Sequence, residues 1–118
     1  MIKQVIVMRK DLNMRKGKMI VQGAHASSHI ILRLYPSATS LLSEWLVYNY
    51  GRKICVYVNS EEELLEVYDK ANKAGLYAHL QKDLGHTEFA GLVTTTCCAI
   101  GPGHAERINE ITGHLPLL

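Results

Sequence analysis

Residues 53–81 read KICVYVNSEEELLEVYDKANKAGLYAHLQ, and this stretch decides the fold class. Its first six residues are apolar and rich in β-formers, which predicts a buried strand. Ser60 and Glu63 then form a capping box, and the acids that follow Ser60 suit the positive end of a helix dipole. Gly75 ends this helix, and the last six residues predict another strand. A strand, a helix and a strand in this order are typical of a βαβ unit.

The flanking sequence extends this unit in both directions. The other predicted elements are strands at 2–8 and 95–100 and helices at 17–33, 39–48 and 104–112. Gly101-Pro102-Gly103 is interpreted as the end of a strand and the start of a helix. The order β-α-α-β-α-β-β-α predicts a single α/β domain over residues 1–118. We expect a four-stranded mixed sheet, mostly parallel with one antiparallel pair, and helices on both faces.

The composition of the chain is typical of a globular domain. The chain has 118 residues, of which 47% are hydrophobic and 20% charged, an ordinary balance for a protein with its own core. Its three cysteines are interpreted as reduced core residues. Charged residues recur from Lys3 onward, which argues against a signal peptide, and no apolar run reaches membrane-spanning length. We expect a soluble cytoplasmic protein without membrane association.

The first predicted helix carries a polar stripe among small and apolar residues. In GKMIVQGAHASSH at 17–29, Lys18, Gln22, His25 and His29 are spaced by four, three and four residues, which places them on one helical face. His25 and His29 have a spacing that can bind zinc. However, no HExxH motif and no nearby cysteine complete such a site. We therefore predict no metal site, and no nucleophile elbow, P-loop or dinucleotide fingerprint is present.

Positive charge gathers around the same helix. Residues 1–40 hold seven Lys or Arg and one acid, whereas residues 41–118 hold six and ten. The basic cluster consists of Arg9, Lys10, Arg15, Lys16 and Lys18. Such asymmetry suggests an anionic partner, but a solvated basic surface explains the charge equally well.

In an open α/β sheet, binding and catalytic residues lie at the carboxyl ends of the strands. Lys18, the KDLGHT loop with Asp83 and Thr87, and the threonines at 94–96 can meet there. A carboxylate that takes a proton from water and a lysine that balances developing charge would support hydrolysis. Taken singly, each residue also has a structural interpretation, as a surface cation, a turn cap or a strand former.

The chain resembles the type 2 peptidyl-tRNA hydrolases almost from end to end. The resemblance rests on VMRKDLNMRKGK at 7–18, QGAHA at 22–26, QKDLGHT at 81–87, AIGPG at 99–103 and ITGHLPLL at 111–118. It implies a mixed four-stranded sheet flanked by helices. It also implies hydrolysis of the ester between a peptide and the 3′-terminal ribose of tRNA, without metal or organic cofactor. Members of this family often form dimers, so the resemblance implies a homodimer.

The resemblance also assigns roles to residues. Lys18 matches the lysine of the family's GK motif, Asp83, Gly85 and Thr87 match its DxGxT loop, and the strand threonine falls on Thr96. Asp83 is expected to orient or deprotonate water, and Lys18 to stabilise the oxyanion or the departing ribose oxygen. Thr87 and Thr96 would supply hydrogen bonds. Substrate binding is expected from Gln22, His25, Gly85, Arg9, Lys10, Arg15 and Lys16, the last four through tRNA phosphates.

Several positions depart from the family pattern beside the expected site. Leu84, His86 and Glu88 stand where the family usually has Ala, Arg and Gln, which lowers the local positive charge. A catalytically silent RNA-binding domain is therefore one alternative, and a small-ligand or protein-interaction module is another. Within the enzyme hypothesis, a nearby lysine lowers the pKa of a carboxyl group. Asp83 is then either the base or only the partner that holds Lys18.

Overall fold

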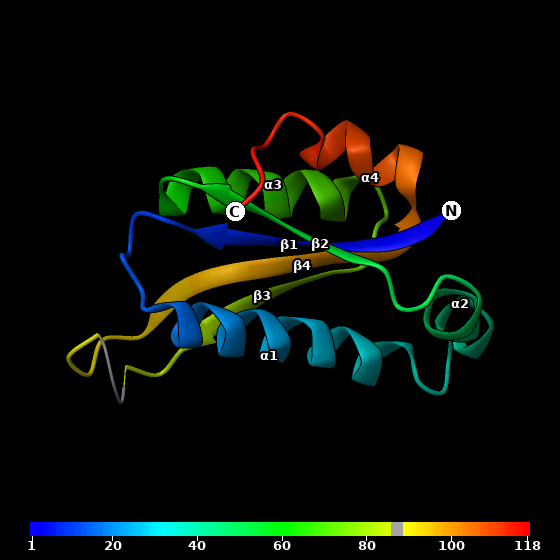
Figure 1. The fold of residues 1–118 in the computed structure, drawn as a ribbon, viewed down its shortest axis with the longest axis horizontal. Helices are drawn as coiled ribbons and strands as arrows, with labels where there is room; N and C mark the ends of the chain where they lie inside the picture. The colour runs from blue at the N-terminus through cyan, green and yellow to red at the C-terminus, as the bar shows by residue number, and fades with distance from the viewer. Residues whose placement is uncertain (86–88) are drawn as a thin grey trace.

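A computed structural model describes residues 1–85 and 89–118 as two layers of helices around a sheet (Figure 1). The described elements follow the predicted order. They are β1 (Ile2–Arg9), α1 (Lys16–Leu34), α2 (Thr39–Ser43), the π-helical turn η1 (Glu44–Tyr48), β2 (Lys53–Val58), α3 (Glu61–Lys73), β3 (Ala78–Asp83), β4 (Thr94–His104) and α4 (Ala105–Thr112). Within these ranges, no helix combines the length and hydropathy that a membrane span requires.

The four strands form one mixed sheet in the order β2-β1-β4-β3, which confirms the predicted fold class. β1 and β2 are parallel, with Val7 opposite Val56, whereas β4 runs antiparallel to both β1 and β3. The expected predominance of parallel pairs is therefore wrong, because two of the three neighbouring pairs are antiparallel. β4 lies between β1 and β3 in the sheet, and its Cys97, Cys98 and Ile100 are completely buried.

Helices cover both faces of the sheet, as predicted. α1 and α2 lie on one face, and α3 and α4 lie on the other (Figure 1). On the first face Ala26, Ile30 and Leu34 of α1 pack with Met8 of β1. A cluster that includes Leu64 of α3 and other apolar residues of α4 and the strands fills the second face.

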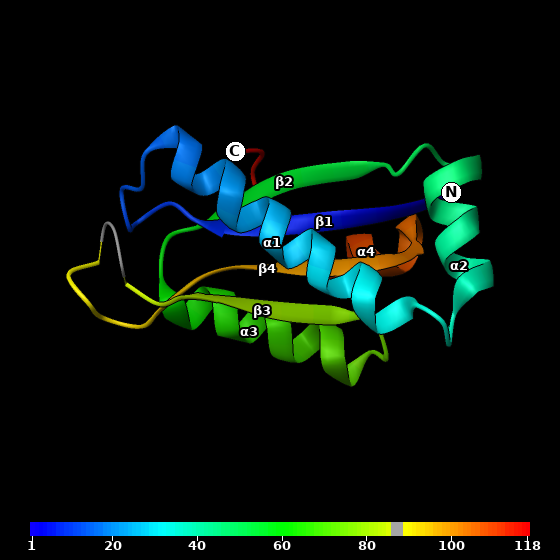
Figure 2. The ribbon, with the colours of Figure 1, turned by 90° about the horizontal axis from the view of Figure 1, so that it is seen from below.

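Gly23 brings α1 close to the sheet. A Cβ atom at Gly23 would lie 3.6 Å from Ile6 and 3.7 Å from Met8, so the helix backbone already lies directly over β1. α1 crosses the sheet diagonally from the β2 side at its first turn towards β3 at its last (Figure 2). The side chain of Lys18, in its first turn, nevertheless reaches Asp83 at the carboxyl end of β3.

The boundaries of β3 and β4 differ from the sequence prediction. Leu76 donates its backbone N–H to Ala71 and so still closes the end of α3, which makes β3 start two residues later than expected. As a result Asp83 is the last residue of β3 rather than a loop residue. β4 continues through Gly101-Pro102-Gly103 to His104, because Ile2 and Lys3 pair with His104 and Gly103 beyond a register shift. The prediction that this tripeptide ends the strand is therefore wrong.

Candidate active site

An ion pair between α1 and β3 lies at the centre of the candidate site. Lys18, in the first turn of α1, places its Nζ 2.6 Å from Oδ1 of Asp83, the last residue of β3. The two side chains are only 15% and 10% exposed, so water screens this pair far less than a surface pair. Sixty-five positions separate the two residues, and the fold brings them together as the sequence predicts.

Asp83 receives further hydrogen bonds from the protein. The side-chain Nε2 of Gln22 donates to Oδ1 at 3.2 Å, and the backbone N–H of Gly85 donates to Oδ2 at 2.9 Å. An ammonium and two N–H groups around one carboxylate suit its ionised form. Gly85 has a φ of +82°, and a Cβ atom there would lie 2.6 Å from the backbone of Gly91 and Leu92, so a side chain does not fit.

Thr96 reaches Asp83 through Gln22. Its hydroxyl is fully buried and donates to Oε1 of Gln22 at 2.7 Å. Because the amide oxygen of Gln22 is held in this way, its NH₂ group points towards Asp83. The predicted residues Lys18, Gln22, Asp83, Gly85 and Thr96 therefore form one connected polar network. Phe89 borders it, with its ring centroid 5.8 Å from Lys18 Nζ.

A pocket of about 250 Å³ adjoins this network. It is lined by Gln22, His25, Gln81, Lys82, Asp83 and Leu84. His25 therefore lies beside the network, and among the described residues it makes no hydrogen bond to Lys18 or Asp83.

Beyond the pocket, His29 stacks on His79 with ring centroids 4.4 Å apart and an interplanar angle of 16°. Partial burial lowers the pKa of His79, and the nearby His29 and Arg33 lower it further, against a hydrogen bond with Gln81 that raises it. Helical spacing places His29 on the polar stripe, but it does not identify His79 as the partner of His29. Strand alternation puts His79, Gln81 and Asp83 on one face of β3, and this signal could have identified it.

The basic cluster divides into buried and exposed members. Arg9 is 8% exposed and binds the carboxylate of Asp11 through Nε and Nη2, at 3.2 and 2.7 Å. Its Nη1 donates to the backbone oxygen of Thr95 and lies 3.5 Å from Glu61. These bonds with Arg9 lower the pKa of Asp11. The guanidinium of Arg9 is thus bonded to other groups of the protein. We had expected it to contact tRNA phosphate instead.

The other basic residues lie on the surface around the start of α1. Lys10, Arg15 and Lys16 are exposed, and Lys10 Nζ lies 4.4 Å from the ring centroid of Tyr57. Thr87, together with the departures His86 and Glu88, lies outside the described residues.

Cys97 contacts the polar network, since its thiol donates to the backbone oxygen of Gln22 at 3.5 Å and lies 3.9 Å from the Thr96 hydroxyl. All three cysteines are free, as predicted, and burial raises the pKa of Cys97 to about 12 and that of Cys98 still further. Their thiols are therefore protonated at neutral pH and poor nucleophiles. Within residues 1–85 and 89–118, no group of three His, Cys, Asp or Glu side chains is arranged to hold a metal ion.

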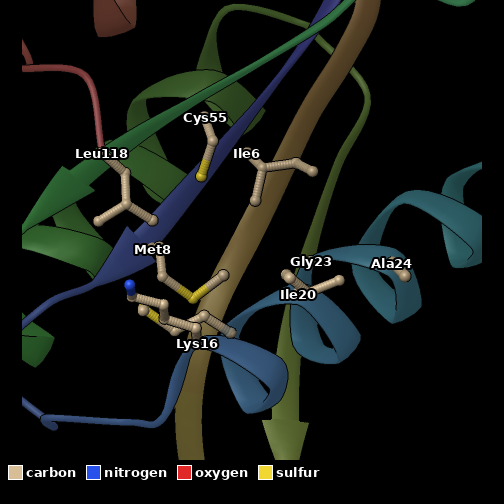
Figure 3. A pocket seen from close by; sticks show the side chains of 9 residues that line it. Ile6, Met8, Lys16, Ile20, Gly23, Ala24, Cys55 and Leu118 are labelled. Atoms are coloured by element: carbon tan, nitrogen blue, oxygen red, sulfur yellow. The ribbon is translucent and has the colours of Figure 1, made fainter.

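A second, larger pocket lies on the opposite flank of α1. It has a volume of about 570 Å³, and apolar side chains of β1, β2 and α1 form most of its lining (Figure 3). Figure 3 shows Met8, Ile6 and Cys55 on the strand side, with Gly23, Ile20 and Lys16 across from them on the helix. Leu118 borders the same pocket, and its backbone N–H bonds to Cys55.

The polar network suits hydrolysis of an ester or a similar acyl compound. A carboxylate can accept a proton from water, and an adjacent ammonium can stabilise an oxyanion or a leaving oxygen. A family model described as "Peptidyl-tRNA hydrolase PTH2" matches residues 2–118 of the chain. The chain belongs to this family. The match covers every element that contributes to the network.

Curated members of the PTH2 family resemble this chain over its whole length. The peptidyl-tRNA hydrolase of Methanocaldococcus jannaschii is 44% identical, and the alignment covers 99% of this chain and all of the relative. The protein of the same name from Methanothermobacter thermautotrophicus is 42% identical over 99% of this chain and all of the relative. That from Methanopyrus kandleri is also 42% identical, over all of this chain and 99% of the relative.

Proposed function

We propose that this chain hydrolyses the ester between a peptide and the 3′-terminal ribose of tRNA in peptidyl-tRNA, releasing tRNA for reuse. Membership of the PTH2 family supports this reaction. The observation that carries the proposal is the contact between Lys18 and Asp83, because it brings an ammonium and a carboxylate together beside a pocket. Such a reaction belongs to translation, and we place the protein in the cytoplasm.

In the proposed mechanism, Asp83 orients a water molecule and takes a proton from it as the water oxygen attacks the ester carbonyl. Lys18 stabilises the negative charge that develops on the carbonyl oxygen or on the departing ribose oxygen. The bond between the carbonyl carbon and the ribose oxygen then breaks, and the proton passes to the ribose oxygen. Gln22, held by Thr96, keeps Asp83 in position.

The test measures release of tRNA from an N-acetylated aminoacyl-tRNA. Asp83→Asn and Lys18→Met should each lower kcat by about 100-fold or more, because each removes a group that acts on the transition state. A matched control is the exposed ion pair of Lys70 and Glu66 on α3, in which Lys70 Nζ lies 3.1 Å from Glu66 Oε1. Lys70→Met should leave kcat unchanged.

The outcomes separate the proposed enzyme from its alternatives. Binding of tRNA without release by the wild-type protein would indicate a catalytically silent RNA-binding domain, and absence of both would indicate an interaction module. If Asp83→Asn retains full activity while Lys18→Met does not, another group activates the water.

We propose that Lys10, Arg15 and Lys16 contact tRNA phosphates. They surround the start of α1 and so lie next to Lys18 along the chain. Each phosphate contact contributes about 0.7–0.9 to the slope of log affinity against log salt concentration. Replacing Lys10 and Lys16 by Gln should therefore reduce this slope by about one to two, and an unchanged slope would remove them from the interface.

We propose that a second copy of this chain packs against the apolar pocket on the other flank of α1, giving a homodimer. Ile20 and Leu118 line this pocket and expose 72% and 48% of their surface, which favours a protein partner there. Ile20→Asp should give monomers in sedimentation experiments. Leu32→Asp is the matched control, since Leu32 is also 72% exposed on α1 but does not line the pocket. A wild-type monomer would refute this dimer.

A further inference from the structure

A β-bulge interrupts the pairing of β3 with β4 beside the active site. Gln81 pairs with Cys97, but the next residue of β3, Lys82, pairs with Thr95, so the pairing skips Thr96. An extra residue of this kind bends its strand and can re-aim a side chain, and bulges are frequent next to active sites. The bulge thus falls on the residue whose hydroxyl holds Gln22.

The bulge changes which face of the sheet the threonine side chains meet. Next to it, Cys97 packs on the face that α1 covers, and Cys98 packs on the face that α3 covers. Regular alternation would therefore direct Thr96 towards α3. Instead its hydroxyl donates to a side chain of α1, whereas the hydroxyl of Thr95 donates to Glu61 of α3 at 2.9 Å. The bulge therefore turns Thr96 into the active site.

Arg9 bonds to the backbone of the bulge from the strand on its other side. β1 pairs with β4 as far as Met8 and Cys97, and Arg9 is the next residue of β1. Its Nη1 donates at 3.0 Å to the backbone oxygen of Thr95. A carbonyl within a sheet needs a donor, and a bulge disrupts the ladder that would supply one. The guanidinium therefore takes the place of a ladder bond at the bulge.

Two acids hold this guanidinium in place. Asp11 binds its Nε and Nη2 through both carboxylate oxygens, and Glu61 lies 3.5 Å from its Nη1. A bidentate pair of this kind fixes the plane of the guanidinium, and Arg9 is only 8% exposed. One side chain thus joins the turn after β1, the start of α3 and the start of β4.

We propose that Arg9 is a positioning residue of the active site, which holds the bulge and thereby keeps Thr96 directed at Gln22. The inference rests on the proposed function, in which Gln22 keeps Asp83 in position for hydrolysis. Arg9 acts through the strand rather than on the substrate, because its guanidinium contacts α3 on the opposite face of the sheet from the ion pair.

The test measures kcat and KM, per folded enzyme, for release of tRNA from an N-acetylated aminoacyl-tRNA. Arg9→Met should lower kcat about threefold to tenfold, because Thr96 is then poorly directed. KM should change by less than about twofold, since the lost contact is not one with the substrate. Arg107→Met is the matched control: this guanidinium also donates to a backbone oxygen, that of Ala74 after α3, and its loss should leave kcat unchanged.

A double-mutant cycle shows whether Arg9 acts through Thr96. Thr96→Val should itself lower kcat, and adding Arg9→Met to it should then cause no further decrease. Asp11→Asn weakens the hold on the guanidinium and should give a smaller decrease that also disappears in the Thr96→Val background. A purely structural role of Arg9 would leave kcat per folded enzyme unchanged in both backgrounds.

The outcomes separate this inference from the proposed function. Wild-type kcat per folded enzyme in Arg9→Met, or an equal decrease in both backgrounds, would overturn the inference and leave the proposed function intact. If Arg9→Met does not fold, Asp11→Asn decides the question by the same two criteria. If the wild-type protein releases no tRNA from the N-acetylated substrate, the proposed function fails and this inference fails with it.

Discussion

Replacing Thr96 by valine tests how the active-site carboxylate is held. Valine has nearly the shape of threonine but lacks the hydroxyl, so the change removes one hydrogen bond without a large cavity. The lost bond is the one of 2.7 Å from the fully buried Thr96 to Oε1 of Gln22. Gln22 itself is 3% exposed, so water does not easily replace the missing donor.

The expected loss follows from this burial. A buried acceptor that loses its donor costs about 1–3 kcal/mol, and the added methyl group of valine offsets part of it, about 0.8 kcal/mol. We expect a net loss of about 0.2–2 kcal/mol in the free energy of unfolding. For a domain of this size, Tm should fall by about 1–10 °C. Because the amide of Gln22 is then free to turn its oxygen towards Asp83, kcat should also fall about tenfold.

Urea unfolding and single-turnover release of tRNA measure these two effects. Thr112→Val is the matched control. Thr112 lies on α4, far from the site, is 3% exposed, and donates at 3.2 Å to the backbone oxygen of Ile108. A helix carbonyl is less dependent on this extra donor, so Thr112→Val should cost less than about 1 kcal/mol and leave kcat unchanged. Wild-type kcat in Thr96→Val would refute the role given to Gln22.

Three further changes test other parts of the structure. Gly85→Ala should lower the free energy of unfolding by about 2 kcal/mol or more and abolish activity, because the backbone at φ +82° leaves no room for a Cβ atom; normal Tm and activity would contradict the close contact. His79 has a lowered pKa in the folded state, so its contribution to stability is complete above the unfolded pKa near 6.5 and is lost as pH falls below it. His79→Phe keeps a ring against His29 and should flatten urea-unfolding stability between pH 7.5 and 5.5; an unchanged slope would exclude His79 as its source. Arg9→Met should destabilise the protein by about 1–3 kcal/mol through loss of its bonds to Asp11 and Thr95, yet leave the salt dependence of KM unchanged; a reduced salt slope would instead make Arg9 a phosphate contact.

The sequence predicted the elements of this fold better than their arrangement. Local signals such as the capping box at Ser60 and the positive φ of +75° at Gly75 depend only on neighbouring residues, and both occur where expected. Strand order depends instead on which strand is buried on both faces. The apolar run of β4 is compatible with an edge or a central place until the helices are docked. Its central position could therefore not be deduced from periodicity.

The candidate site was predictable to a similar degree. The rule that chemistry gathers at strand ends brought Lys18 and Asp83 together, although their roles came from the family resemblance. The buried position of Arg9 was not predictable from charge, because a guanidinium and the ammonium of Lys10 contribute equally to a basic cluster. What separates them is the bidentate pairing of Arg9 with Asp11, which requires the turn after β1 to fold back.

The central position of β4 has a consequence for a chain that emerges from the ribosome. β1 and β3 are separated by the last strand to be synthesised, so neither has its inner neighbour while residues up to Asp83 are emerging. Thr96 also belongs to that strand, so the nascent chain has no complete active site during this interval. Two apolar strand edges remain open to other chains over the same period. Co-translational protection should therefore matter most between the emergence of β3 and that of β4.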